Sequence, residues 1–216
     1  MSKNKTALLM ISFVILFCLF LYFVPVKELF SKIPLISKFY NNTTLEIVTQ
    51  KGKAKIWING EDYGETPAKI EDLPEGNYVV EIEKIVSEDS FYEKHSFQIE
   101  LTKNTSARID LEIGPEDLLQ GSILYYTPSK VSSKDGLLTI TSNIQNAKVY
   151  LDKEFLKEAP VSNISLKDNQ YEMKISATGY ESVEIPIYIR SGYQLNLKTY
   201  HFPIPVSLEA VETENE

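Results

Sequence analysis

Two segments of this chain repeat each other, and this repeat restricts the fold to one built from two copies of a single unit. Residues 45–82 align with residues 138–175 at a constant offset of 93, without a gap, and ten positions are identical. The identical pairs are Leu45/Leu138, Ile47/Ile140, Ala54/Ala147, Lys55/Lys148, Glu61/Glu154, Glu65/Glu158, Pro67/Pro160, Leu73/Leu166, Tyr78/Tyr171 and Ile82/Ile175. Residues 92–101 then align with residues 180–189 at an offset of 88, so the first copy carries a longer loop.

Each copy contains short runs in which apolar and polar residues alternate, which is the period of a strand with one buried face. The positions expected in the core of the first copy are Leu45, Ile47, Ala54, Ile56, Ile58, Tyr78, Val80, Ile82, Phe97, Ile99, Leu101, Ile109, Leu111 and Ile113. The same pattern runs from Leu138 to Leu197 in the second copy. Short strands separated by turns predict an all-β chain with two tandem small antiparallel β-sandwich domains.

Turn-forming residues separate several of these runs. In the first copy, Asn59–Gly60 lies between two strand-like segments, and this pair readily adopts the two positive φ angles of a tight hairpin. Residues 74–76, Pro-Glu-Gly, fit a second β-turn, because proline fixes φ and glycine follows at the end of the turn. The second copy has Asp152–Lys153 and Asp168–Asn169 at these places, so it keeps turn-tolerant residues but has lost the glycines.

These residues resemble the PEGA domain family. Its pattern is V-x-I-N-G, then G-x-T-P, then L-x-P-G-x-Y-x-V, and the first copy has AKIWINGEDYGETP at residues 54–67 and LPEGNYVV at residues 73–80. The second copy is similar through residues 147–152, 159–160, 166, 171 and 177–180, but lacks the glycines, with Lys153 and Lys157 in their places. The resemblance implies a prealbumin-like β-sandwich of surface and envelope-anchored proteins, which is usually a non-catalytic module and carries no catalytic residues.

An uncharged run of 21 residues, 6–26, is long enough for one helix to cross the hydrocarbon core of a bilayer. A cleaved signal peptide is disfavoured, because no small-residue cleavage pattern follows the run. A lipoprotein signal at Cys18 is also disfavoured, because Phe17 occupies the position that needs a small residue. The run therefore predicts a permanent transmembrane anchor.

The charges flanking this run suggest an orientation. Lys3 and Lys5 favour a cytoplasmic N-terminus, so we expect a single-pass plasma-membrane protein with its domains outside the cytoplasm. Lys27, Lys32 and Lys38 lie on the far side, so the opposite orientation stays open. The expected parts are a cytoplasmic stub (1–5), the transmembrane helix (6–26), a juxtamembrane stalk (27–42), the first PEGA-like domain (43–113), an interdomain connection (114–135), the second, degenerate PEGA-like domain (136–200) and an acidic C-terminal tail (201–216).

The connection at residues 114–135 is too apolar for a free linker, so we expect it to pack. It contains Leu118, Leu119 and the run Ile123–Tyr126. If it contributes a strand, the two domains would form a fairly rigid unit; otherwise they would swing on the segment 129–136.

The sequence offers little for catalysis, metal binding or a cofactor. His95 and His201 are the only histidines, Cys18 is the only cysteine, and no hydrolase or metal motif occurs. Acidic groups such as Glu61, Asp62 and Glu65 have the chemistry to flank calcium, but solvated hairpin charges explain them more simply. We therefore expect no enzyme activity, no catalytic or metal residues and no cofactor.

Charge also limits the partners. Beyond residue 42 the chain has 17 basic and 29 acidic residues, a net charge of about −12, which disfavours nucleic acid. Four aromatic residues are candidates for contact with a glycan or a protein, namely Trp57, Tyr63, Tyr125 and Tyr126. Trp57 is out of phase with the core positions of its strand, so it faces outward or is covered by other residues. We favour cover by the connection 114–135.

The expected partners are the membrane, through the N-terminal helix, and a cell-envelope protein or polysaccharide. The favoured function is a membrane-anchored, non-enzymatic binding or spacer module of the cell envelope. The alternative is an accessory ectodomain of a membrane signalling or secretion complex. That alternative is weaker, because five cytoplasmic residues cannot form a signalling domain.

Overall fold

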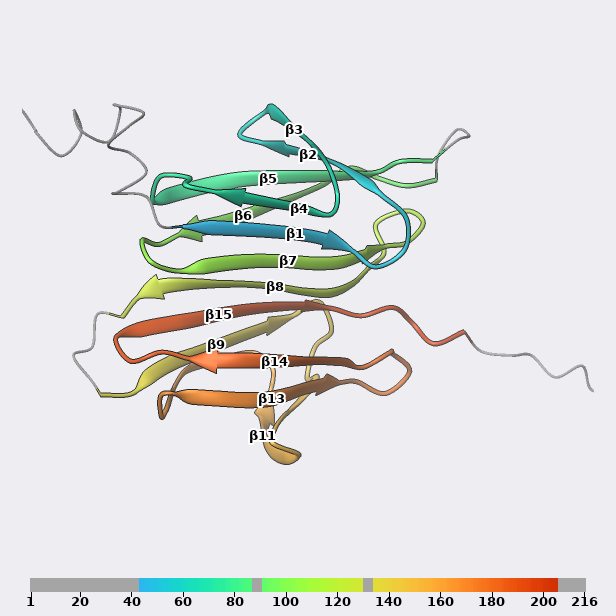
Figure 1. The fold of residues 1–216 in the computed structure, drawn as a ribbon. Coiled ribbons are helices and arrows are strands. Elements are labelled where there is room, and N and C mark those ends of the chain that lie inside the picture. The colour runs from blue at the N-terminus through green and yellow to red at the C-terminus, as the bar shows by residue number, and fades with distance from the viewer. Residues whose placement is uncertain (1–42, 87–90, 130–133, 206–216) are drawn as a thin grey trace, which may run out of the picture. The chain divides into compact units, whose positions relative to one another are not determined.

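The computed structural model describes residues 43–86, 91–129 and 134–205, and every regular element in them is a β-strand (Figure 1). The all-β prediction is therefore confirmed. Within these ranges no helix has the length and apolar character needed to cross a membrane. The predicted stub, transmembrane helix and stalk at residues 1–42 lie outside the described residues, as do residues 206–216 of the predicted tail.

The first repeat forms seven strands in two layers. The strands are β1 (Thr44–Thr49), β2 (Ala54–Ile58), β3 (Glu61–Glu65), β4 (Ala68–Glu71), β5 (Gly76–Lys84), β6 (His95–Leu101) and β7 (Ser106–Ile113). One layer is a four-stranded sheet in the order β3-β2-β5-β6, and the other contains β4-β1-β7. Alternating residues fill the space between the layers as predicted, with Leu45, Ile56 and Ile109 completely buried.

The second repeat has the same topology. Its strands are β9 (Gly136–Ser142), β10 (Lys148–Leu151), β11 (Glu154–Glu158), β12 (Val161–Leu166), β13 (Asn169–Ser176), β14 (Val183–Ile189) and β15 (Tyr193–Tyr200). They form a four-stranded sheet in the order β11-β10-β13-β14 and a second layer of β12-β9-β15. The hairpin turn predicted at residues 59–60 and its counterpart at residues 152–153 are also present, since Asn59 and Gly60 have φ of 50° and 82°, and Asp152 and Lys153 have 49° and 72°.

The prediction of antiparallel sandwiches needs a correction. Strand β1 pairs with β7 in parallel, and β9 pairs with β15 in parallel, while the other pairs are antiparallel. In each repeat the first and last strands are neighbours in one layer. The chain therefore crosses to the other layer after the first strand and returns before the last. Alternation of apolar residues predicts a strand and its buried face but says nothing about the direction of its partner.

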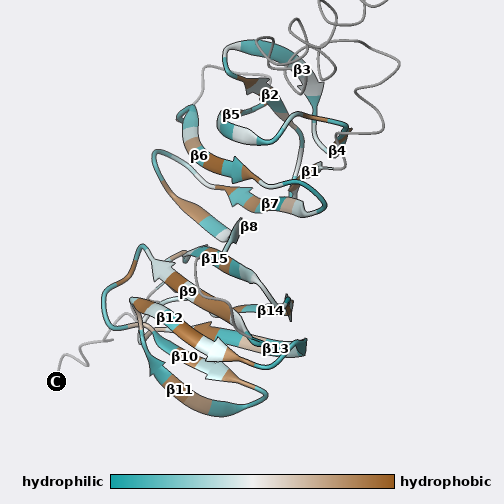
Figure 2. Cartoon of the chain, turned by 90° about the vertical axis from the view of Figure 1, so that its left-hand side faces the viewer, coloured by the Kyte–Doolittle hydropathy of each residue, from teal (hydrophilic) through white to brown (hydrophobic). Residues whose placement is uncertain are grey.

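The connection between the repeats forms a strand, β8 (Leu119–Pro128), that joins the two sandwiches. On one side it pairs antiparallel with β7, where Ile123 lies opposite Ile109, and on the other with β15, where Tyr126 lies opposite Leu195. The result is one seven-stranded sheet in the order β12-β9-β15-β8-β7-β1-β4, with β8 between the sandwiches (Figure 2). The expectation that this connection packs is confirmed.

The two cores use opposite faces of β8. Leu119, Ile123 and Tyr125 belong to or pack against the core of the first repeat, whereas Leu124 and Tyr126 contact the core of the second. Successive side chains of a strand point to opposite faces of its sheet. The two four-stranded sheets therefore cover opposite faces of the shared seven-stranded sheet.

Candidate functional site

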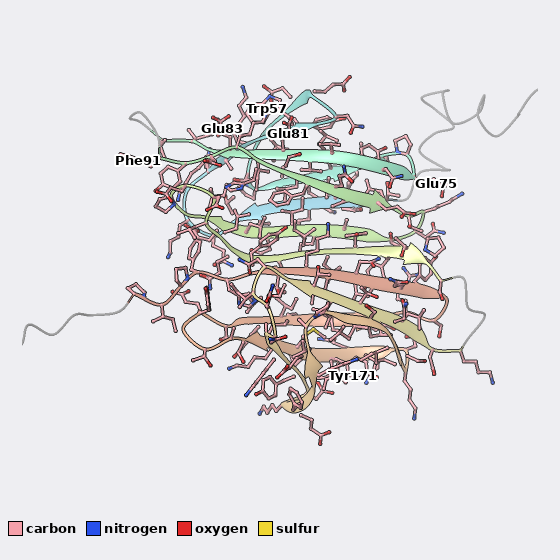
Figure 3. The ribbon with its side chains drawn as sticks, turned by 180° about the vertical axis from the view of Figure 1, so that it is seen from behind. Trp57, Glu75, Glu81, Glu83, Phe91 and Tyr171 are labelled. Atoms are coloured by element: carbon pink, nitrogen blue, oxygen red, sulfur yellow. The ribbon has the colours of Figure 1, made fainter. Side chains whose placement is uncertain are left out.

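The outer face of the four-stranded sheet in the first repeat carries the only tryptophan of the chain. Ile56 and Ile58 on β2 point into the core, so Trp57 between them points outward and is half-buried. Its ring lies beneath two ammonium groups, with the Nζ atoms of Lys94 and Lys55 at 4.1 and 5.2 Å from the ring centroid. Glu81 and Glu83 lie close by on β5, as Figure 3 shows.

The lysines around Trp57 are held by acids on neighbouring strands. Lys94 lies 3.1 Å from Glu81, and Lys55 lies 3.1 Å from Asp62. The pKa of Asp62 is lowered first by the N–H of Gly64, which donates to its carboxylate at 2.8 Å, and then by Lys55. These pairs are partly or fully exposed to solvent and contribute little to stability. An aromatic face flanked by charged groups can instead stack on a sugar ring or contact a charged peptide.

The second repeat has an aromatic residue at the equivalent position. Tyr150 aligns with Trp57 at the offset of 93, and its ring meets that of Phe155 edge to face at a centroid distance of 5.7 Å. It lines a hollow of about 570 Å³ on the outer face, together with Lys153, Glu172, Met173, Lys174, Ser176 and Glu184. Both repeats thus present an aromatic ring among paired charges on the outer face of their four-stranded sheet.

The structure separates the four aromatic residues proposed from the sequence. Trp57 faces outward under its two lysines, which is the alternative to the favoured cover by residues 114–135. Tyr63 packs against the core of the first repeat, and Tyr125 does the same from β8. Tyr126 is buried in the second core, where its hydroxyl donates to the carbonyl of Tyr188 at 2.6 Å. Of the four, Trp57 alone belongs to an outer sheet face.

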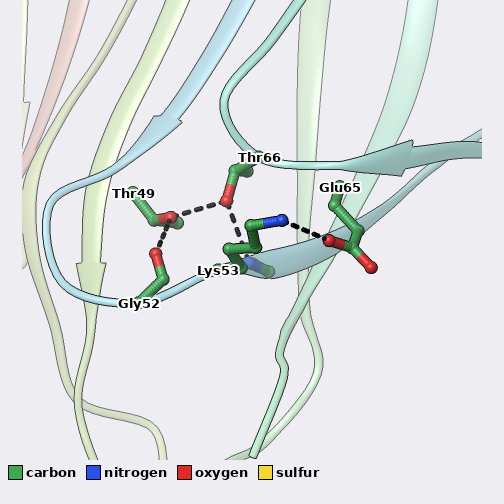
Figure 4. A network of polar contacts seen from close by, with 6 residues as sticks. Thr49, Gly52, Lys53, Glu65 and Thr66 are labelled. Carbon is green, nitrogen blue, oxygen red and sulfur yellow. Dashed lines mark hydrogen bonds and ion pairs between the residues drawn. The ribbon is translucent and has the colours of Figure 1, made fainter.

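Two of the three acids considered for calcium binding, Asp62 and Glu65, are paired with lysines instead. Lys53 lies 3.0 Å from Glu65, next to a network in which the Thr66 hydroxyl contacts that of Thr49 at 2.6 Å and accepts the N–H of Ala54 at 2.9 Å (Figure 4). This network ties the β1–β2 turn to the start of β4. Among the described residues, no group of three or more His, Cys, Asp or Glu side chains is arranged to hold a metal ion.

One surface was not predicted, a groove between β6 and the shared sheet. It consists of two hollows of about 450 and 760 Å³ that share Glu100. Their other lining residues are Asn77, Tyr78, Val79, Gln98, Ile99, Tyr125, Thr127, Pro128, Ser129, Leu137, Asn163, Gln194 and Lys198. The groove is built by both repeats and by β8. No pattern along the sequence indicated it, because it depends on how β8 joins the repeats.

The fold therefore defines an all-β protein whose two sandwiches share a sheet and present outer aromatic faces. The sequence pattern of the PEGA domain matches residues 42–117 and 135–201, and the chain belongs to the PEGA domain family. The search of curated proteins found no match. Among solved structures, the chain is similar to the Bacillus anthracis TIE protein, at 15% identity and a TM-score of 0.24, over 76% of this chain and 34% of that one. The chain thus spans about a third of the length of that protein.

Proposed function

We propose that this chain is a membrane-anchored, non-enzymatic protein of the cell envelope. Residues 6–26 hold it in the plasma membrane with its N-terminus in the cytoplasm, and its two PEGA domains work outside as a binding or spacer module for a protein or a polysaccharide. Membership of the PEGA family supports this proposal, as does the uncharged run at the N-terminus.

The observation that carries the proposal is the shared strand β8. Residues 119–124 of β8 pair with β7 and residues 121–128 pair with β15, so the two domains are joined by backbone hydrogen bonds as well as by the chain. A spacer needs such a joint, because a free linker would let the domains swing independently. The joint would also benefit a binding module, because it fixes the positions of the two outer aromatic faces relative to each other.

Protease treatment of intact cells tests the location. We expect added protease to remove both PEGA domains while a cytoplasmic control protein survives. If the domains are cleaved only after the membrane is broken, the proposed orientation is wrong and the module acts in the cytoplasm.

Affinity capture with the full-length chain tests the binding role. Purified cell-wall glycan and a detergent extract of membranes are offered separately to the wild type and to Trp57→Ala, Tyr150→Ala and Ile204→Ala variants. We expect the first two substitutions to weaken capture and Ile204→Ala, at an exposed position near the end of the described chain, to leave it unchanged. Retention of a membrane protein with no glycan binding would favour the accessory role in a signalling or secretion complex. Hydrolysis abolished by one Asp or Glu substitution would contradict the non-enzymatic role.

A further inference from the structure

Six strands form the edges of the three sheets in the described residues, and five of them have a feature that hinders pairing with another chain. Strand β4 has only four residues, and β14 contains Pro186. Register shifts interrupt the pairing of β3, β11 and β12 with their neighbours. Short strands, prolines and bulges are the usual protection of sheet edges. Strand β6 has none of these features, because its seven residues pair with β5 without interruption and include no proline.

The hydrogen bonds of β5 show which backbone groups of β6 are unpaired. Val79 accepts the N–H of Asn59 at 2.8 Å and donates its own N–H to the Asn59 side chain at 2.9 Å, so its backbone groups face β2. Backbone direction alternates along a strand, so Tyr78 and Val80 face β6. Their partners are Ile99 and Phe97, whose backbone groups therefore face β5. The N–H and C=O groups of Ser96, Gln98 and Glu100 point away from β5, where no described strand pairs with β6.

The second repeat closes the same edge in two ways. Ile187 lies opposite Tyr171 as Ile99 lies opposite Tyr78, so Pro186 corresponds to Gln98 and Tyr188 to Glu100. Pro186 has no N–H to offer, and the carbonyl of Tyr188 accepts the hydroxyl of Tyr126 at 2.6 Å. Neither device is present in the first repeat, so β6 is open where β14 is closed.

The open edge borders the groove that both repeats line. Glu100 and Lys198 both line this groove, and no ion pair joins either of them to another described residue. The groove thus combines an unpaired strand with one free charge of each sign. These features suit an extended chain, which fills backbone hydrogen bonds along an edge and directs side chains to flanking groups.

We propose that β6 is a docking edge for an extended peptide segment of a partner protein, which adds a strand to the β3-β2-β5-β6 sheet and places a basic side chain near Glu100 and an acidic one near Lys198. The proposal rests on the proposed function as a binding module and specifies its partner. A second copy of the chain docking through β6 is a poorer match, because β6, HSFQIEL, contains no lysine or arginine to meet Glu100.

The test uses the full-length chain in detergent micelles and a phage-displayed library of random dodecapeptides. Enriched peptides are synthesised with a fluorophore, and their affinities are measured by fluorescence anisotropy for the wild type and for Gln98→Pro and Gln98→Ala. The proline removes one outward N–H at the position where the second repeat itself has Pro186, so the β5–β6 pairing is kept. We expect Gln98→Pro to weaken binding at least tenfold and Gln98→Ala to change it less than twofold.

A charge exchange provides an independent readout should Gln98→Pro fold poorly. Glu100→Lys is expected to weaken binding of the enriched peptides at least fivefold, and exchanging their basic residue for glutamate is expected to restore it. Absence of any enriched peptide, equal binding by well-folded Gln98→Pro, or no effect of Glu100→Lys would overturn the proposal. A concentration-dependent dimer that Gln98→Pro abolishes would also overturn it, in favour of self-pairing. If peptides fail to bind while glycan or membrane-protein capture persists, the docking edge is rejected and the proposed function stands.

Discussion

At the scale of single residues, His201 shows how a polar group is built into the second sandwich. The side chain is almost completely buried, with Nδ1 2.8 Å from the carbonyl of Glu181 and Nε2 3.2 Å from the hydroxyl of Thr199. Burial lowers the pKa of His201 below its ordinary value of 6.5, and burial lowers the pKa of His95 in the same direction. The sequence places residue 201 in the C-terminal tail. The two prolines and the later acids of that tail give no indication that its first residues pack against the domain.

These histidines predict that stability falls in mild acid. Below pH 6.5 the unfolded chain binds more protons than the folded one, so the stabilisation is complete above that value and is lost as the pH falls from 6.5 toward the lowered folded pKa. Urea unfolding followed by circular dichroism at pH 7.5 and 5.5 measures this loss. We expect His201→Gln to unfold more easily at pH 7.5 but to lose less stability between the two values. An equally steep loss in the variant would show that His201 is not responsible.

A second prediction concerns the buried ion pair of the first sandwich. The Nζ atom of Lys84 lies 3.4 Å from Glu112, donates to the carbonyl of Ile113 at 2.7 Å and lies 4.5 Å from the ring centroid of Tyr92. Only 15% of the Lys84 side chain and 8% of that of Glu112 are exposed. Lys84→Met leaves a buried carboxylate without its counter-charge and is expected to cost about 3 kcal/mol. Adding Glu112→Gln to Lys84→Met should recover most of the lost stability, because it removes the unpaired buried charge. Urea unfolding followed by Trp57 fluorescence, which reports this sandwich, measures both values, and an unchanged Lys84→Met midpoint would contradict the argument.

At the scale of elements, the hairpin turns show what short sequence patterns can predict. Asn59–Gly60 was expected to have two positive φ angles, and it does. Lys153 occupies the second of these positions in the other repeat at a φ of 72°, which is strained for a residue with a side chain. The same turn thus occurs in both repeats, but it is strained in the second repeat and not in the first.

This difference predicts opposite effects for one exchange made in both repeats. Lys153→Gly should stabilise the chain by about 0.5 kcal/mol, because relief of the strained φ exceeds the added freedom of the unfolded chain. Gly60→Lys should destabilise it by about 1 kcal/mol. An added Cβ at Gly60 meets no atom within 4 Å, so the cost comes from φ alone. Thermal unfolding of the two variants beside the wild type measures the effects, and shifts of the same sign would refute the explanation.

Other element-level features could not be predicted from the pattern. Alternation located the core positions of β5, β6 and β7, because a buried face requires apolar residues at every second position. It could not show that β1 and β7 run parallel, nor that Trp57 lies beneath two lysines, since both depend on residues distant in the sequence. The groove beside β6 was missed for the same reason. The aromatic type of Trp57 indicated a candidate site, but only the strand pairing placed it on the outer face.

At the scale of the whole described unit, β8 decides how the repeats are combined. Its residues alternate between two cores, which explains why the connection is apolar on both faces: Ile123 and Leu124 are neighbours that pack into different sandwiches. The sequence indicated that this segment packs, but a strand with two apolar faces can serve one core, two cores or another chain. Only pairing to both β7 and β15 distinguishes these cases.

Gly121 is where this joint is most sensitive. It lies in β8 opposite Leu111 with a φ of 124°, and an added Cβ would stand 2.1 Å from the carbonyl oxygen of Asp110. Gly121→Ala must therefore displace β8 from β7, and we expect a loss of about 3 kcal/mol or more. Gly179→Ala is the control, because Gly179 also has a positive φ but an added Cβ meets nothing within 4 Å. Its expected cost is about 1 kcal/mol.

The joint also predicts how the two sandwiches unfold. In the wild type, Trp57 fluorescence, which reports the first repeat, and circular dichroism, which reports both, should give the same urea midpoint, because the shared sheet couples the two cores. In Gly121→Ala the fluorescence transition should come first and the two midpoints should separate, since β8 remains paired with β15 while its contact with β7 is lost. Coincident midpoints in this variant, with a large loss of stability, would mean that the cores are coupled through contacts other than the β7–β8 pairing.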